Sequence, residues 1–474
     1  MSELTSDDPA ITEEKPGRLR RGSIGVAGMV FMVVAATAPL TAMASNLSLS
    51  LGFGAGEGTL GWIVLIGLLL VVFTSGYVAL ARTVVSAGAY HAYISHGLGP
   101  ATGSAAAFVA AIAYNLATAG MIVAAGFFTD LTLATYAGID LHWSLYSAVV
   151  LVLVGLSGHF GVGVASRLTT VVSLAQFVLL AVLAVAVLVQ RPEGFSPEGF
   201  TPTATFSGGF ALTAVFVLLS FAGYEAAAVY GEECNAPGRK ITQATYLALG
   251  LLVLVFLIST WTIIASYADV AATAGADPGS VLGGAADRYL GSFTGAVISG
   301  IVAFSFAAAA VAFHSLSTRY AFALGRAGLL PAALGRTHPV RSTPYVAVIG
   351  QIVVDLAIIV PFAIGGADPL SALFPAVSGV TSLALIALMA TCSVSAVVAS
   401  VRGTLNGGGT FATRVCPTVA ALGLVTVGAL IVANYPQVTG SDSPAVIAMP
   451  GVLVVGALAG AWAARRGSAD LSTV

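Results

Sequence analysis

Long apolar blocks separated by short polar stretches dominate this chain. Twelve of these blocks approach the roughly 20 residues that a helix needs to cross a bilayer. Their apolar residues fill each block instead of forming one amphipathic stripe, which is typical of helices surrounded by lipid or protein. The pattern therefore predicts an all-α integral membrane protein whose spans lie near residues 24–52, 60–81, 102–128, 142–160, 166–189, 208–231, 243–266, 293–318, 344–364, 371–399, 416–435 and 445–464.

The composition and the charge distribution agree with this pattern. Only 8% of the residues are charged, whereas soluble proteins carry about 25%. Cytosolic loops of membrane proteins are enriched in Lys and Arg. With the N-terminus inside, all but two of the 18 Lys and Arg residues fall on the cytosolic side, and the exceptions are Arg191 and Arg288. We therefore expect a multi-pass protein of the cell (cytoplasmic) membrane with both termini in the cytosol.

Two predicted spans are interrupted near their middle. Span 1 contains Pro39, which lacks a backbone donor and clashes with the preceding helical turn, and span 6 contains Gly223 next to Glu225. These spans are the first members of two five-span halves, and matched interruptions in two halves indicate the binding site of a secondary transporter. Freed N–H groups can bind a carboxylate, and freed carbonyls can bind an ammonium group. The matched pair favours this interpretation over a proline kink and a packing glycine.

Four motifs occur in order along the chain. They are Ser86-Ala-Gly-Ala-Tyr-His-Ala-Tyr93 with Gly97-Leu-Gly-Pro100, Phe221-Ala-Gly-Tyr-Glu225 with the segment 231–241, the segment Ser317–Pro331, and His338-Pro339 with Thr343-Pro344. Together they resemble the signatures of the amino acid–polyamine–organocation superfamily, and within it the amino acid permease family. The resemblance covers nearly the whole chain.

The resemblance implies a ten-helix inverted-repeat core in residues 23–400 that works by alternating access, and accessory helices 11 and 12 in residues 401–466. Polar tails of residues 1–22, which we expect to be disordered, and 467–474 would lie in the cytosol. It also implies that the break in span 1 binds the substrate carboxylate and that the break in span 6 binds the amino group, flanked by spans 3, 8 and 10. The implied substrate-binding residues are Ala36, Thr37, Ala38, Pro39, Leu40, Thr41, Tyr114, Phe221, Ala222, Gly223, Tyr224 and Glu225.

Ionisable residues within the spans are functional candidates, because a charge is costly in the bilayer. Glu225 could carry a coupling proton, face a substrate amine or bond the freed backbone, and His314 is the second coupling candidate. We expect Asp130 to lie at the membrane interface and Asp355 to have a structural role, pairing with another helix. Acidic and basic residues at cytosolic helix ends form a candidate inner gate: Glu232, Glu233, Arg239, Arg319 and Arg326.

Motifs of other protein classes are absent from the sequence. There is no Walker A sequence, no HExxH motif and no CxxC pair among the three cysteines. We therefore expect no cofactor, no metal site, no enzyme activity and no nucleic acid partner. The predicted function is an amino acid permease whose partners are its small-molecule substrate, the bilayer and a candidate coupling proton. A polyamine- or ethanolamine-type carrier and a non-transporting nutrient sensor stay open as alternatives.

Overall fold

The computed structural model describes residues 24–86, 89–160, 162–279, 281–291, 293–366, 369 and 373–466. The two expected tails, residues 1–22 and 467–474, lie outside these ranges. The side chain of Glu232 is also outside the description, although its backbone belongs to a described helix.

Within the described ranges, twelve helices are long and apolar enough to cross a membrane, as the pattern predicts. Span 1 comprises α1 (Val26–Thr37), α2 (Pro39–Ala42), η1 (Met43–Leu47) and α3 (Ser48–Phe53), and span 6 comprises α10 (Phe210–Ser220) and η5 (Tyr224–Glu233). The other spans are built on α4 (Thr59–Thr83), α6 (Pro100–Ala137), α7 (Trp143–Phe160), α8 (Val162–Gln190), α11 (Pro237–Ser266), α14 (Thr294–Arg326), α15 (Tyr345–Ile364), α16 (Phe374–Val401), η8 (Phe411–Val415) with α17 (Cys416–Ala433), and α19 (Pro444–Ala448) with α20 (Gly451–Arg466).

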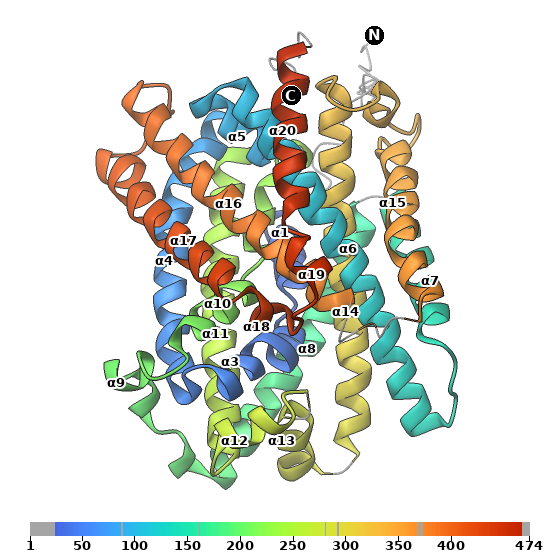
Figure 1. The fold of residues 1–474 in the computed structure, drawn as a ribbon, viewed down its shortest axis with the longest axis vertical. Coiled ribbons are helices and arrows are strands. Elements are labelled where there is room, and N and C mark those ends of the chain that lie inside the picture. The colour runs from blue at the N-terminus through green and yellow to red at the C-terminus, as the bar shows by residue number, and fades with distance from the viewer. Residues whose placement is uncertain are drawn as a thin grey trace, which may run out of the picture.

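Short helices that the span prediction did not include lie at the two ends of the bundle. Figure 1 shows α5 at one end, and α9, α12 and α13 at the opposite end. Their bounds are α5 (Ala89–Leu98), α9 (Pro202–Thr205), α12 (Val270–Ala276) and α13 (Val281–Leu290), and α18 (Tyr435–Thr439) connects the last two spans. The remaining connections contain the short helices η2 (Gly56–Gly58), η3 (Pro192–Gly194), η4 (Pro197–Phe200) and η6 (Ala332–Gly335).

Burial separates the interior spans from the peripheral ones. In an apolar 18-residue stretch of each span, 83% of the residues of Phe210–Gly231 and 72% of those of Val26–Phe53 are buried, against 28% for Phe411–Ala433 and 11% for Pro444–Arg465. The broken spans 1 and 6 therefore occupy the centre, and the last two spans present apolar side chains outward. This is the arrangement that an interrupted backbone needs, because its freed polar groups must be shielded from lipid.

Candidate functional site

The break in span 1 lies one residue before the proline that we expected to cause it. Helix α1 ends at Thr37, and Ala38 adopts a left-handed φ of 42° before α2 begins at Pro39. A proline fits the first position of a helix, because the N–H that it lacks would have no partner there. The N–H of Leu40 donates to Oε1 of Gln176 on α8 at 3.2 Å. Gln176 thus stabilises the break, a role that we did not predict for it.

The break in span 6 meets the break in span 1 at Gly223. Helix α10 ends at Ser220, Gly223 has a φ of 96°, and the 3₁₀-helix η5 follows. A Cβ atom added to Gly223 would lie 3.1 Å from Cβ of Ala36 and 3.4 Å from the ring of Phe313. Glycine is required here both for its backbone conformation and for this close approach.

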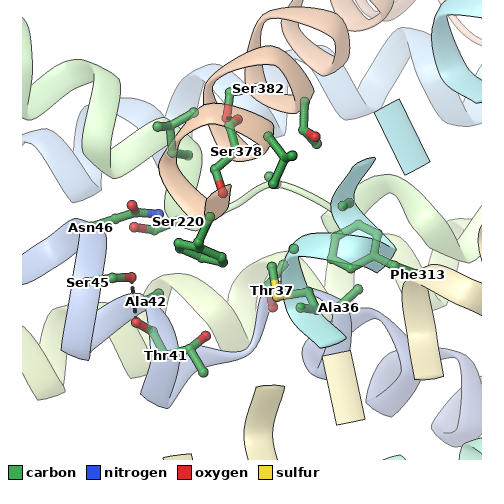
Figure 2. Close-up of a pocket in the computed structure, with 18 of the residues that line it drawn as sticks. Ala36, Thr37, Thr41, Ala42, Ser45, Asn46, Ser220, Phe313, Ser378 and Ser382 are labelled. Atoms are coloured by element: carbon green, nitrogen blue, oxygen red, sulfur yellow. Dashed lines mark hydrogen bonds between the residues drawn. The ribbon is translucent and has the colours of Figure 1, made fainter. Parts of the chain in front are cut away.

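A cavity of about 80 Å³ lies beside the two breaks, and Figure 2 shows the side chains that surround it. Spans 3, 8 and 10 complete its wall, as the family resemblance implies. The lining residues are Ala36, Thr37, Thr41, Ala42, Ser45, Asn46, Ala117, Gly120, Met121, Leu219, Ser220, Ala222, Phe306, Phe313, Phe374, Val377, Ser378, Thr381 and Ser382. None of these described lining residues is charged.

Hydroxyl groups face the cavity from two sides. Figure 2 shows Ser378 and Ser382 of α16 across the cavity from Thr41 and Ser45 of span 1. Ser45 lies in the π-helical turn η1, a distortion that recurs at functional sites. Its hydroxyl donates to the carbonyl of Thr41 at 2.7 Å. The cavity therefore combines neutral hydrogen-bonding groups with apolar walls.

The twelve predicted substrate-binding residues divide into four groups. Ala36, Thr37, Thr41 and Ala222 line the cavity. The backbone of the two breaks contains Ala38, Pro39, Leu40 and Gly223, while Phe221 and Tyr224 line a second, apolar cavity of about 10 Å³. Tyr114 and Glu225 are absent from the lining of both cavities and bond to each other.

The sequence contained a signal for some lining residues that we missed. Ser378, Thr381 and Ser382 are spaced three and four residues apart in span 10, so a helix presents them on one face. Asn46 and Ser220, which flank the two breaks, also line the cavity. Their polarity next to the interruptions was the available clue.

Glu225 is buried behind Tyr114. Its carboxyl Oε1 accepts a hydrogen bond from the Tyr114 hydroxyl at 3.2 Å, and its backbone carbonyl accepts one from the Tyr77 hydroxyl at 2.9 Å. The second carboxyl oxygen, Oε2, has no hydrogen-bond partner in the described part of the chain. The ring of Tyr114 lies 6.3 Å from that of Phe313, which lines the cavity. Glu225 is therefore connected to the cavity wall through these aromatic rings.

Two of the five gate candidates form a buried ion pair. Nε of Arg319 on α14 lies 2.6 Å from Oε1 of Glu233 on η5, and the side chains are only 6% and 5% exposed. The Arg319 guanidinium also donates to the carbonyl of Ser315 at 2.7 Å and lies 4.9 Å from the centre of the Tyr230 ring. The pair joins span 6 to span 8 at the end of the bundle that the charge count assigns to the cytosol.

The other gate candidates and His314 lie elsewhere. The Arg326 guanidinium lies 5.2 Å from the centre of the Phe322 ring, and Arg239 is exposed. His314 is also absent from the cavity lining, and its Nδ1 lies 3.9 Å from Oδ2 of Asp355 on α15. The structure thus brings His314 together with Asp355, which we expected to pair with another helix, although the sequence did not identify the partner.

Comparison with known proteins decides the family. The sequence model of the amino acid permease family matches residues 24–458. The chain belongs to the amino acid permease family. It is 28% identical to an uncharacterised transporter of Rhizobium meliloti over 298 residues, or 60% of each chain. It is also 28% identical to the branched-chain amino acid permease BcaP of Bacillus subtilis over 208 residues, or 43% of each chain. These alignments span less than two thirds of either relative.

Solved structures share the fold of this permease. MhsT in complex with L-phenylalanine superimposes with a TM-score of 0.60 at 14% identity, covering 85% of this chain and 98% of MhsT. A manganese transporter of Eremococcus coleocola, solved with an aromatic bis-isothiourea substituted compound, gives 0.57 at 13% identity, covering 93% and 95%. Structural matches at such low sequence identity show only that the fold is shared. They confirm the predicted fold class, a multi-pass inverted-repeat transporter core with two broken helices.

Proposed function

We propose that this permease carries amino acids with uncharged side chains across the cytoplasmic membrane by alternating access. The observation that supports this most directly is the character of the cavity beside the two breaks. Its described lining offers hydroxyl, amide and backbone groups but no charged side chain. A zwitterion suits such a site, because backbone dipoles can stabilise its carboxylate and its ammonium group separately, and no fixed charge is left unpaired.

The two breaks supply these dipoles in opposite senses. The second half of span 1 begins at Pro39, so the positive end of its helix dipole faces the carboxylate. The hydroxyls of Thr41 and Ser45 donate to the carbonyls of Ala38 and Thr41 in this structure, and in this proposal they rotate to donate to the carboxylate. Helix α10 ends at Ser220, and carbonyls at a helix C-terminus are acceptors for the ammonium group. In this proposal the substrate backbone lies between the two spans.

The rest of the lining selects the side chain. Phe313, Phe374, Met121 and Val377 form apolar walls from three different helices. One water needs about 10–15 Å³ of such space, so a cavity of about 80 Å³ has room for roughly five to eight water-sized groups. This number is close to the number of non-hydrogen atoms in a small apolar amino acid. A larger side chain would need Phe313 or Phe374 to rotate.

The distribution of basic residues supports the proposed orientation. Helix α5 and the buried Arg319–Glu233 pair belong to the Lys- and Arg-rich side, which we assign to the cytosol together with both termini. In this arrangement the ion pair closes the path from the cavity to the cytosol. Alternating access would then require the pair to separate when the permease opens inward.

The geometry favours an amino acid over a polyamine. A carrier for a di- or polycation needs a carboxylate that reaches the substrate, and Glu225 was the candidate for that role. Its Oε1 instead accepts a hydrogen bond from Tyr114, and Glu225 is absent from the cavity lining. The printed name of one relative, a branched-chain amino acid permease, also supports an amino acid substrate.

An uptake screen in proteoliposomes tests the proposal. Radiolabelled neutral, acidic and basic amino acids, putrescine and ethanolamine are compared, each with and without a pH or a sodium gradient. We expect saturable uptake of small apolar amino acids and none of putrescine. If only the amines enter, or if no compound accumulates or exchanges, the proposal is wrong.

A matched pair of variants tests the site itself. Thr41→Val removes a hydroxyl from the cavity, whereas Thr426→Val removes one from the exposed face of α17. A hydrogen bond contributes about 0.5–1.5 kcal/mol, so Thr41→Val should raise KM roughly two- to tenfold. Thr426→Val should leave KM unchanged. Equal KM values in both variants would remove Thr41 from the site.

A further inference from the structure

A second polar site lies outside the cavity, between α14 and α15. We call it the His–Asp site and define it by His314, Ser317, Gln351 and Asp355. Nδ1 of His314 lies 3.9 Å from Oδ2 of Asp355, and both side chains are completely buried. Nε2 of Gln351 donates to Oδ1 of Asp355 at 2.9 Å, and the hydroxyl of Ser317 donates to Oε1 of Gln351. The site therefore holds one acid and one base away from solvent.

The polar atoms of this site are only partly satisfied. Oδ2 of Asp355 and both ring nitrogens of His314 have no hydrogen-bond partner within the described residues. Helix α7 closes the site with a glycine, since a Cβ added to Gly158 would lie 3.0 Å from Nε2 of His314. A charged pair that served only to fix two helices would be hydrogen-bonded, at about 2.7–2.9 Å. Buried atoms left without partners are costly and call for a functional explanation.

We propose that His314 and Asp355 together bind one proton, which the permease exchanges with water only when α14 moves relative to α15. With one proton the pair is neutral overall, either as imidazolium and carboxylate or as imidazole and carboxylic acid. With no proton, Asp355 is a buried anion that accepts a hydrogen bond from the Gln351 amide. With two protons, the pair is a buried cation. Both charged states are unfavourable inside the protein, so proton exchange requires the site to open.

Helix α14 connects this site to the transport machinery. Phe313 lines the substrate cavity, His314 faces Asp355, and Arg319 pairs with Glu233. Residues 313 and 319 are six positions apart, which corresponds to about 9 Å along a helix. A movement of α14 that opens the His–Asp site would therefore also displace a cavity wall and the ion pair. This gives a physical route from proton binding to alternating access.

Other titratable groups lie on the helices around the His–Asp site. On the helices packed against α14 and α15 they are Tyr114 and Asp130 of α6, Tyr146 and His159 of α7, Arg167 of α8, Tyr224, Glu225, Tyr230 and Glu233 of η5, and Asp287, Arg288 and Tyr289 of α13. On α14 and α15 themselves they are Arg319, Tyr320, Arg326 and Tyr345. Tyr114 bonds Glu225, Arg319 pairs with Glu233, and Arg288 donates to the carbonyl of Ser266.

The transport test uses this permease in proteoliposomes and rests on the proposed function. Radiolabelled L-leucine and L-phenylalanine are the substrates, and a trapped pH-sensitive dye reports proton entry. If one proton accompanies each substrate, an acidic exterior should drive accumulation by about tenfold per pH unit. Asp355→Asn and His314→Gln should reduce this ratio to about one and abolish the dye signal. Asp130→Asn, which removes a carboxyl of α6 outside the site, should keep both.

A variant that removes the whole pair covers the risk of misfolding. Replacing a buried ion pair by apolar residues is often tolerated, whereas removing one partner leaves an unpaired charge. The double variant H314L/D355L should therefore fold and should also lose the response to the pH gradient. Accumulation that still follows the pH gradient in a folded variant of His314 or Asp355 overturns the proposal. So does wild-type transport that ignores the gradient.

A second measurement needs no substrate, which separates this proposal from the proposed function. Cys234 adjoins the gate residue Glu233, and its alkylation in a C392A/C416A background reports gate opening. At each pH the labelling rate of the wild-type protein is divided by that of H314L/D355L. This ratio should fall as the pH is lowered, because binding of one proton makes the His–Asp site neutral and so favours the closed state. A ratio that is constant with pH overturns the proton site even if no amino acid is transported.

Discussion

The buried Arg319–Glu233 pair provides the sharpest test of how this permease closes toward the cytosol. In the closed state both side chains are at most 6% exposed and their charged atoms are 2.6 Å apart. Arg319→Ala removes the ion-pair partner of the buried Glu233 carboxylate, a loss that costs about 3–5 kcal/mol. If both side chains are solvated in the inward-open state, that state bears none of this cost. The variant should therefore shift the open-to-closed ratio by roughly a hundredfold to several thousandfold.

The native thiol of Cys234 can report this shift. Burial raises the pKa of the Cys234 thiol, so in the closed state the thiol is both covered and mostly protonated. In a C392A/C416A background, a membrane-impermeant maleimide is added to inside-out vesicles and the labelling rate is measured. We expect Arg319→Ala to accelerate labelling strongly. Arg239→Ala, which changes an exposed arginine near the same loop, should leave the rate unchanged.

A second substitution distinguishes a gate from a general loss of structure. Glu233→Gln added to Arg319→Ala replaces the buried carboxylate by a neutral amide, so the double variant should label more slowly than Arg319→Ala alone. General destabilisation predicts the opposite order, because two changes would disturb the protein more than one. Labelling of Arg319→Ala at the wild-type rate would show that the pair does not control access to this side.

Three further predictions concern the two breaks. Gly223→Ala places a side chain at a φ of 96° in the contact between the breaks, so it should lower stability by about 1–3 kcal/mol, measured by thermal unfolding; an unchanged midpoint would contradict this. Tyr114→Phe removes the hydrogen bond to Glu225 and Glu225→Gln replaces its carboxyl acceptor by an amide, so each should reduce uptake by up to about 100-fold without additivity in the double variant; additive losses would show independent roles. Gln176→Leu removes the acceptor of the buried Leu40 N–H and should cost about 1–3 kcal/mol; wild-type stability and KM would refute this.

The features that the sequence predicted well depend on hydrophobicity and covalent geometry. Apolar blocks of span length sufficed to count the helices, because a bilayer imposes both length and composition. The glycine in span 6 and the proline in span 1 marked the two breaks to within a residue. Arg319 and Glu233 were two of the five charged residues at cytosolic helix ends that the sequence proposed as an inner gate, although it did not predict which of the five form a pair.

The features that could not be predicted depend on how each helix is rotated about its axis. Glu225 lies next to a break in sequence, yet the turn at Gly223 points its carboxyl toward Tyr114 and away from the cavity lining. His314 and Asp355 face each other only because α14 and α15 pack in one particular register. Span 8 was predicted to end near residue 318, but α14 continues to Arg326 because a helix can extend into the polar region beyond the bilayer. Hydropathy predicts neither the direction of a side chain, nor how two helices pack, nor how far a helix extends beyond the bilayer.

The placement of charge explains how one permease can close over its cavity in both the loaded and the empty state. A fixed charge in the lining would have to be desolvated whenever the cavity closed empty, at a cost of several kcal/mol. The described lining has no such charge, and a zwitterion brings both charges with it. Arg319 of α14 is instead paired with Glu233 outside the cavity, where His314 also faces Asp355. In the proposed alternating-access cycle the empty carrier therefore returns without burying an unpaired charge, and the pairs that break in that cycle, rather than the cavity, would control its direction.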